Sequence, residues 1–171
     1  IIFQVNDVNK KKSLAAINKL KKINPDVRLE AFNKNLTMVN INQIAKKFDL
    51  IVDGSDNFRT RFLINDYCLK NKKILISGAI SKFDGHIFTF NFKNKKEACL
   101  KCFYEAEPSD DILNCEFEGI LGSVAGIVAN IQANEVIKKI LNIGYDLMGS
   151  ILILNLLSLD MKKVKFTKKR N

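Results

Sequence analysis

The stretch Asp53–Asn57, which reads Asp-Gly-Ser-Asp-Asn, decides the fold because a short apolar segment ends there and a helical pattern begins. Residues 49–53 have the composition of a short buried strand, and residues 57–69 carry apolar side chains at helical spacing. A strand that runs directly into a helix, in a chain that alternates the two, predicts right-handed crossovers and a parallel sheet. Ligands of open α/β sheets bind at the carboxyl edge of the strands, which is where this stretch is expected to lie.

The same alternation precedes this stretch. Residues 7–23 predict a helix that has Asp7 as its N-cap and that ends at Asn24-Pro25. Residues 27–32 predict a strand, and Thr37 is expected to cap a second helix before the strand at residues 49–53.

The pattern changes after residues 73–77, which predict another buried strand. Residues 85–92 alternate, with His86 and three phenylalanines on one face, as an antiparallel strand does. The chain is completed by a cysteine-bearing loop (93–118), a long helix (122–141, ended by Asn142 and Gly144) and a hairpin (150–155 with 162–167). The prediction is one domain over residues 1–171, an α/β fold with a mainly parallel sheet and antiparallel strands in its carboxyl-terminal half.

Composition excludes several classes of protein. The chain has 171 residues, of which 47% are hydrophobic, so it can bury a core and is not disordered. Its longest uncharged apolar stretch, residues 120–131, is much shorter than the roughly 20 residues that span a bilayer. The first residues lack the basic and apolar regions of a secretory signal. No membrane association and a cytoplasmic location are therefore expected.

The formal net charge of +10 has two interpretations. A field of that sign raises the encounter rate with nucleic acids and other anions. The lysines, however, are spread along the chain, and the sequence has no arginine-rich stripe interleaved with aromatic residues. A solvated basic surface is expected, with no nucleic-acid partner.

Asp56 is a candidate site residue because it stands between the predicted strand end and the predicted helix. The amides and dipole of a helix N-terminus favour anions, and a carboxylate there can hold a Mg²⁺ that is bridged to phosphates. The alternative is that Asp56 only caps the helix, and spacing alone favours the cap. Lys12, in the first predicted helix, is either a point charge for a phosphate or an ordinary surface lysine.

Cys99 and Cys102 have the two-residue spacer that lets both thiolates reach one tetrahedral Zn²⁺, which gives half of a structural zinc site. The alternatives are a redox-active pair and an idle pair. Cys68 falls in a predicted helix, where a small buried hydrophobe is favoured. Cys115, in the loop before the long helix, is either a nucleophile of lowered pKa or an ordinary loop cysteine. The only histidine, His86, lies in the alternating strand, which argues against hydrolase chemistry.

Taken in order, these residues resemble the ThiF/MoeB/HesA family, the bacterial relatives of the ubiquitin-activating enzymes. The resemblance covers nearly the whole chain, and the family has a Rossmann-like, doubly wound sheet. The matched segments are Asp7-Val8-Asn9 through Lys12 and Asn24-Pro25; Asp53 through Arg61; Ser77-Gly78; Cys99 to Phe103; and Cys115, Gly119 and Gly122 followed by Gln132-Ala133-Asn134-Glu135 and Lys138.

The resemblance implies an enzyme that uses MgATP to adenylate the C-terminal glycine of a ubiquitin-like sulfur carrier protein, as in molybdopterin or thiamine biosynthesis, and that forms a homodimer. It assigns Lys12 to the nucleotide phosphates, Asp56 with Asn57 to the magnesium-phosphate unit, and Arg61 to the loop or the nucleotide. Cys115 matches a cysteine that forms a covalent intermediate with the carrier in some members. The alternative is a scaffold of the same fold that binds the carrier without turning over ATP.

Two parts of the family's pattern are missing. Family members begin with a strand, a Gly-x-Gly-x-x-Gly turn and a helix, and Ile1-Ile2-Phe3 resembles the sequence that comes after this unit. Residues 168–171 resemble the sequence before a second Cys-x-x-Cys. The chain is therefore expected to be an internal fragment, truncated at both ends, that alone is inactive, binds ATP poorly and holds Zn²⁺ weakly.

Overall fold

The structure is a computed structural model that describes residues 2–94, 97–104 and 119–168. The chain divides into two units, Ile1–Leu36 and Thr37–Asn171, and each is described by itself.

The first unit contains η1 (Val5–Asp7) and α1 (Lys12–Ile23). Asp7 was predicted to be the N-cap of α1, and this prediction is wrong. Its carboxylate instead accepts a hydrogen bond from the Gln4 N–H at 2.8 Å and pairs with Lys19. The helix begins only at Lys12 because Asn9, with a left-handed φ of 65°, interrupts the helical path after η1. The predicted end of α1 at Asn24 is confirmed.

Residues 27–32 do not form the strand that their composition predicts. The sheet begins with β1 (Leu50–Asp53), which pairs with β2 (Ile74–Ser81), and no strand of the described residues pairs with 27–32. A strand is stabilised by hydrogen bonds to a neighbouring strand, which composition alone does not supply. The strand prediction for this segment is therefore wrong.

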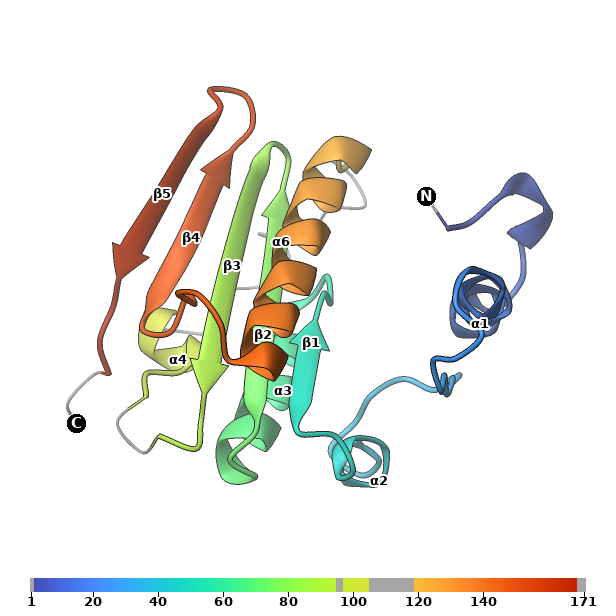
Figure 1. The fold of residues 1–171 in the computed structure, drawn as a ribbon, viewed down its shortest axis with the longest axis horizontal. Helices are drawn as coiled ribbons and strands as arrows, with labels where there is room; N and C mark the ends of the chain where they lie inside the picture. Colours follow the sequence, from blue (N-terminus) through green and yellow to red (C-terminus); the bar gives the residue numbers. More distant parts are fainter. Residues whose placement is uncertain (1, 95–96, 105–118, 169–171) are drawn as a thin grey trace. The chain divides into compact units, whose positions relative to one another are not determined.

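Five strands of the second unit form one sheet in the order β1-β2-β3-β4-β5 (Figure 1). The remaining strands are β3 (Asp84–Asn91), β4 (Ser150–Asn155) and β5 (Asp160–Lys165). β1 and β2 are parallel, whereas the other pairs are antiparallel. The α/β class and the antiparallel carboxyl-terminal half are confirmed. The described sheet is mainly antiparallel rather than mainly parallel, because three of its four strand pairs are antiparallel and two of those are joined as hairpins.

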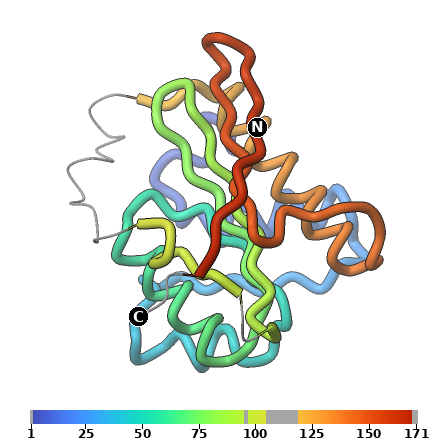
Figure 2. The backbone as a smooth tube through the Cα atoms, turned by 90° about the vertical axis from the view of Figure 1, so that its left-hand side faces the viewer, coloured from blue at the N-terminus to red at the C-terminus, as the bar shows by residue number. Residues whose placement is uncertain are grey.

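The β4–β5 hairpin is confirmed, although β5 starts before the predicted residue 162. Asp160 pairs with Asn155 directly across the turn, so the ladder begins there. The turns of the β2–β3 and β4–β5 hairpins lie at the same end of the sheet (Figure 2).

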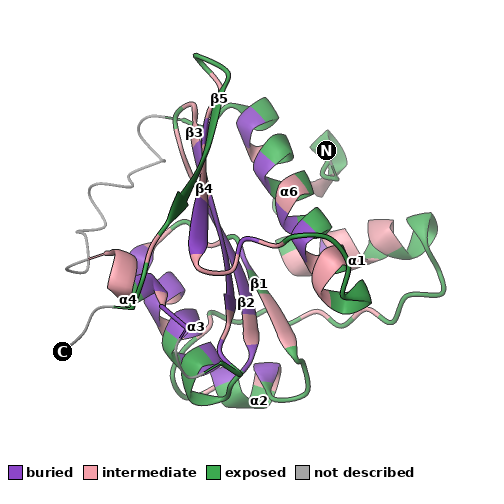
Figure 3. Cartoon of the chain, turned by 60° about the vertical axis from the view of Figure 1, so that its left-hand side comes forward, coloured by how far each residue is buried: buried purple, intermediate pink, exposed green. Residues whose placement is uncertain are grey.

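Two long helices, α3 (Phe58–Lys70) and α6 (Gly122–Leu141), cover opposite faces of the sheet (Figures 1 and 3). Figure 3 shows the buried side of α6 turned towards the sheet. The predicted bounds of α6 are confirmed, and its end is set by Asn142, whose φ of 52° is left-handed. The buried residues of α6 recur at helical spacing: Val124, Val128, Gln132 and Glu135.

Two short helices complete the second unit: α2 (Ile41–Ala45) and α4 (Leu100–Phe103). The N-cap of α2 is Asn40, so the predicted cap at Thr37 is too early. Thr37 instead opens the turn before the helix, where its Oγ1 accepts the Asn40 N–H at 3.4 Å. α4 lies within the segment that was predicted as loop.

The alternation predicted for β3 is confirmed, and its two faces build two cores. On the α3 side, the ring of Phe90 stacks between those of Phe88 and Phe92, with centroid distances of 5.7 and 5.5 Å. On the α6 side, Ile87 packs in a buried cluster with Val128, Leu147 and Leu154. β3 is therefore buried on both faces, whereas β5 at the edge of the sheet is exposed.

Gly78, within β2, has no room for a side chain. A Cβ added there would lie 2.5 Å from Cδ and Oε1 of Gln132. We expect Gly78→Ala to lower the free energy of unfolding by about 1–3 kcal/mol, because the amide or the strand must move. Gly126→Ala in α6 is the control, since a Cβ there meets nothing within 4 Å and alanine favours the helix. Urea unfolding of both variants measures the difference, and equal midpoints would contradict the expectation.

No helix in the described part of the chain is both long and apolar enough to cross a bilayer.

Candidate functional site

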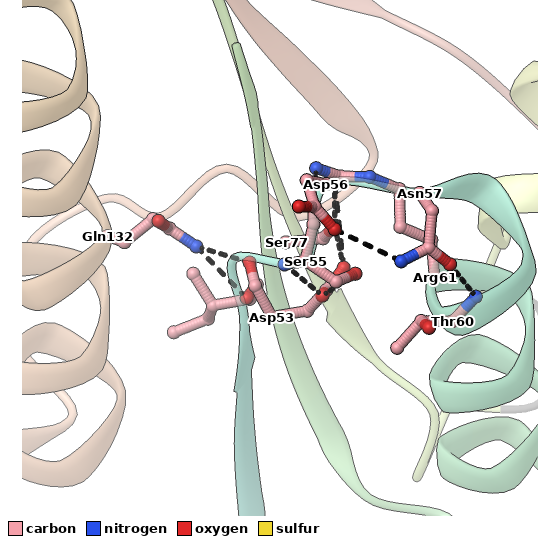
Figure 4. A network of polar contacts seen from close by, with 9 residues as sticks. Asp53, Ser55, Asp56, Asn57, Thr60, Arg61, Ser77 and Gln132 are labelled. Atoms are coloured by element: carbon pink, nitrogen blue, oxygen red, sulfur yellow. Dashed lines mark hydrogen bonds and ion pairs between the residues drawn. The ribbon is translucent and has the colours of Figure 1, made fainter. Parts of the chain in front are cut away.

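The carboxylate of Asp53, the last residue of β1, is the centre of a buried polar network (Figure 4). Its Oδ1 accepts hydrogen bonds from the Ser55 N–H at 2.9 Å and the Ser55 hydroxyl at 2.7 Å. Its Oδ2 accepts the Ser77 hydroxyl at 2.8 Å. Asp53 as a whole is only 2% exposed, so these bonds replace the water that a free carboxylate would need.

Arg61, on α3, supplies the positive charge of this network. Its Nη1 lies 3.5 Å from Asp53 Oδ2 and donates to Ser77 Oγ at 3.3 Å. Its Nη2 donates to the carbonyl oxygen of Ser55. Arg61 thus contacts the loop that follows β1, and a role for Arg61 at a nucleotide stays a prediction.

Gln132 reaches the same strand end from α6, on the other face of the sheet (Figure 4). Its Nε2 donates to the carbonyl oxygens of Asp53 at 2.9 Å and of Ile76 at 3.4 Å. Asp53, Ser77 and Gln132 were not singled out by sequence reasoning as site residues. One feature of the sequence could have identified Gln132: it is a polar residue at a position of the long helix whose helical spacing predicts burial.

Asp56 and Asn57, the two residues before α3, make different contacts. Asn57 is the N-cap of α3, and its Oδ1 accepts the Thr60 N–H at 2.8 Å. Asp56 is exposed, and its Oδ1 accepts a hydrogen bond from Asn57 Nδ2 at 3.1 Å. The interpretation of Asp56 as the helix cap is therefore wrong, because its neighbour makes that contact. The Asp56 carboxylate remains available to a ligand.

A pocket of about 190 Å³ opens beside this turn. Asp56 and Arg61 line it on the side of the turn, and Gln132 lines it on the side of α6. The rest of the lining is small or apolar and includes Gly54, Gly78, Ala125 and Ala129. Arg61 is already paired with Asp53, and in the described ranges no lysine or arginine forms an ion pair with Asp56. The uncompensated charge of the pocket is therefore negative.

Lys12 is the first residue of α1 and belongs to the unit Ile1–Leu36. The pocket belongs to the unit Thr37–Asn171. A role for Lys12 at the pocket stays a prediction.

Cys99 and Cys102 lie at the two ends of the first turn of α4, with Cys99 as the N-cap. Their Sγ atoms are 3.7 Å apart, close to the separation of about 3.8 Å expected for two thiolates at 2.3 Å from one tetrahedral Zn²⁺. Asn65 of α3 fixes the turn between them, because its Oδ1 accepts the Leu100 N–H at 3.0 Å. Burial, and then the neighbouring thiol, raises the pKa of Cys99. Among the described residues, no group of three or more potential metal ligands comes together.

Cys68 is fully buried in α3, as predicted, and burial raises the pKa of its thiol to about 12. Cys115 lies outside the described residues. We expect a thiol reagent at about pH 8 to label Cys99 and Cys102 long before Cys68, because the thiolate is the reactive form. Peptide mass mapping of timed samples checks this, and labelling of Cys68 at the rate of Cys99 would contradict it.

A sequence model described as the ThiF family matches residues 1–171. The chain belongs to the ThiF family.

Relatives of this ThiF-family chain include two proteins named as adenylyltransferases. It is 36% identical over 170 residues to a probable molybdopterin-synthase adenylyltransferase of Porphyra purpurea, and the match covers 96% of the chain and 43% of that protein. It is 34% identical over 175 residues to a sulfur carrier protein adenylyltransferase of Thermus thermophilus, and the match covers 100% of the chain and 64% of that protein. The chain therefore spans less than two thirds of the length of these relatives.

The fold of this ThiF-family chain is similar to solved structures of low sequence identity. The crystal structure of E. coli MccB with ATP superposes with a TM-score of 0.80 at 17% identity, over 99% of this chain and 52% of that one. The crystal structure of PaaA gives a TM-score of 0.76 at 14% identity, over 96% of this chain and 58% of that one. At such identities the likeness concerns the fold alone.

Proposed function

We propose that this chain is part of an adenylyltransferase that uses ATP to activate the C-terminal glycine of a ubiquitin-like sulfur carrier protein. The observation that carries the proposal is the Asp56 carboxylate. This carboxylate is exposed beside a pocket at the carboxyl end of β1, and it does not cap α3 because Asn57 is the N-cap. The names of the Porphyra and Thermus relatives support this class of reaction.

The proposed reaction joins the carrier to AMP. An oxygen of the terminal carboxylate attacks the α-phosphorus of ATP, the bond from that phosphorus to the bridging oxygen breaks, and pyrophosphate leaves with its electron pair. The product is a mixed anhydride between the carboxylate and AMP. No proton needs to be removed from a carboxylate nucleophile, so the step requires positioning and charge neutralisation rather than acid–base catalysis. Among the described residues that line the pocket there is no histidine, cysteine or lysine, so the charge of the phosphates must be neutralised by a group from outside this lining.

Mg²⁺ is proposed as the partner of Asp56. A polyphosphate beside Asp56 would face a like charge, since Arg61 is engaged by Asp53. A divalent cation between the carboxylate and the phosphates removes this repulsion, and carboxylate oxygens are ligands that Mg²⁺ prefers. Asp56 would hold the ion, Asn57 would hold the Asp56 carboxylate, and we propose that Lys12 neutralises a phosphate from α1.

Zn²⁺ is proposed for Cys99 and Cys102, whose Sγ separation of 3.7 Å fits two ligands of a tetrahedral ion. The other two ligands would come from outside the described residues. We also propose that residues 1–171 form one ThiF-type domain and that the protein is a cytoplasmic homodimer. Cys115 is proposed to bond covalently to the carrier: its thiolate attacks the carboxyl carbon of the mixed anhydride, a thioester forms, and AMP leaves with the electron pair of the broken bond.

Pyrophosphate–ATP exchange tests the proposal. The protein at its full natural length, given its carrier and Mg²⁺, is expected to exchange labelled pyrophosphate into ATP, and the chain of residues 1–171 alone is expected not to. Binding of the carrier without any exchange would overturn the proposal and favour a non-catalytic scaffold.

A further inference from the structure

The side chain of Gln132 is buried among groups that fix its orientation. It is 7% exposed, and its Nε2 lies against two backbone carbonyl oxygens, those of Asp53 and Ile76. Carbonyl oxygens only accept hydrogen bonds, so the nitrogen of the amide must face them. The amide therefore ties the end of β1 to the middle part of its parallel neighbour β2.

This contact completes a clamp on the end of β1. On the α3 side, the Asp53 carboxylate is held by Ser55, Ser77 and Arg61. On the α6 side, the Asp53 carbonyl is held by Gln132. These contacts from both faces of the sheet add to the ladder that pairs Asp53 with Ser77, and together they oppose rotation of the strand end.

The turn that carries Asp56 depends on this clamp. Gly54 is exposed, and a Cβ added there would meet nothing within 4 Å, so no packing of its own holds that residue. The turn is fixed before Asp56 at Asp53 and Ser55, and after it at Asn57, the N-cap of α3. A shift of the Asp53 carbonyl is therefore passed on to the Asp56 carboxylate.

Filling space does not account for Gln132. A leucine or methionine of similar size would fill the same volume without the cost of burying an amide. Gly78 leaves open the space that the amide occupies, because a Cβ there would lie 2.5 Å from it. The chain thus keeps both a polar side chain and the gap that admits it.

From these contacts we infer that Gln132 is a positioning residue: it holds the end of β1 so that the Asp56 carboxylate meets the metal–nucleotide. The inference rests on the proposed function, and it adds to that function a residue from the opposite face of the sheet. Gln132 itself touches neither the metal nor the phosphates in this account.

The test uses Gln132→Met in the protein at its full natural length, with two readouts. The first is exchange of the Ser55 amide hydrogen, measured by NMR without any ligand; since this N–H bonds to Asp53 Oδ1, it is expected to exchange about 10-fold faster. The second is the Mg²⁺ concentration for half-maximal pyrophosphate exchange, which is expected to rise about 10- to 100-fold, as for other residues that orient a metal ligand.

Glu135→Gln is the matched control, one turn further along α6. Glu135 is also buried, and its Oε2 accepts the Thr89 hydroxyl at 2.7 Å and the Leu147 N–H at 3.1 Å. This variant is expected to speed exchange of the Leu147 amide while the Ser55 amide and the Mg²⁺ requirement stay as in the unchanged protein. A general loss of stability would instead raise the hydrogen-exchange rates of both the Ser55 and the Leu147 amide in both variants.

The inference is overturned if Gln132→Met leaves Ser55 exchange and the Mg²⁺ requirement unchanged, or changes them no more than Glu135→Gln does. Absence of pyrophosphate exchange in the unchanged protein would overturn the proposed function instead. The Ser55 measurement needs no activity, so the two failures are distinguishable.

Discussion

Asp56→Ala is expected to lower Mg²⁺-dependent pyrophosphate exchange by about 10²–10³-fold, the size of effect seen when one group that stabilises transition-state charge is removed. Asp56 is exposed and does not cap α3, so the variant should fold normally. Exchange kinetics over a range of Mg²⁺ concentrations, with the protein at its full natural length, measure the loss.

Asp49→Asn is the control for this prediction. Asp49 is an exposed aspartate beside the same strand, but it precedes β1 whereas Asp56 follows it. Its removal changes the net charge by the same amount at the opposite end of the strand, and exchange is expected to stay within about 2-fold. Equal losses in both variants would mean that the effect is one of general charge, and the role given to Asp56 would be wrong.

Arg61→Met is expected to lower the free energy of unfolding by about 3–5 kcal/mol, because it leaves the buried Asp53 carboxylate without its counter-charge. Arg61 is 5% exposed and Asp53 is 2% exposed, so water cannot replace the lost contact without opening the strand end. Denaturant unfolding of the variant measures the change.

A double variant separates charge from packing in this prediction. Asp53→Asn with Arg61→Met removes both charges, and it is expected to recover part of the stability that Arg61→Met loses, because no unpaired charge remains buried. If the two single losses simply add in the double variant, the ion pair does not couple the residues and the account of the network fails.

Local patterns in the sequence predicted the second unit well. The helix over residues 122–141 carries its own stop signal in Asn142, and the alternation of β3 identifies the two faces of the sheet. Both signals depend on neighbours in the sequence, so they can be read without the fold. Residues 27–32 show the limit: their composition suits a strand, but pairing depends on another segment.

The candidate site was predictable only in part, for the same reason. The motif gave Asp56, but spacing could not decide between a cap and a ligand, because Asn57 offers an equally good cap one residue later. The contacts of Asp53 with Ser77 and Gln132 join positions 24 and 79 residues apart. Such contacts arise from the order of the strands and from which helix covers which face, and a single sequence does not contain that information in local form.

The central claim is that Asp56 faces a metal-bound nucleotide, and paramagnetic NMR with Mn²⁺ in place of Mg²⁺ tests it most directly. In the protein at its full natural length with bound ATP, Mn²⁺ is expected to broaden the amide signals of Asp56 and Asn57 most strongly, while the signal of Leu147 stays sharp. Sharp Asp56 and Asn57 signals, with ATP and Mn²⁺ both bound, would contradict the claim.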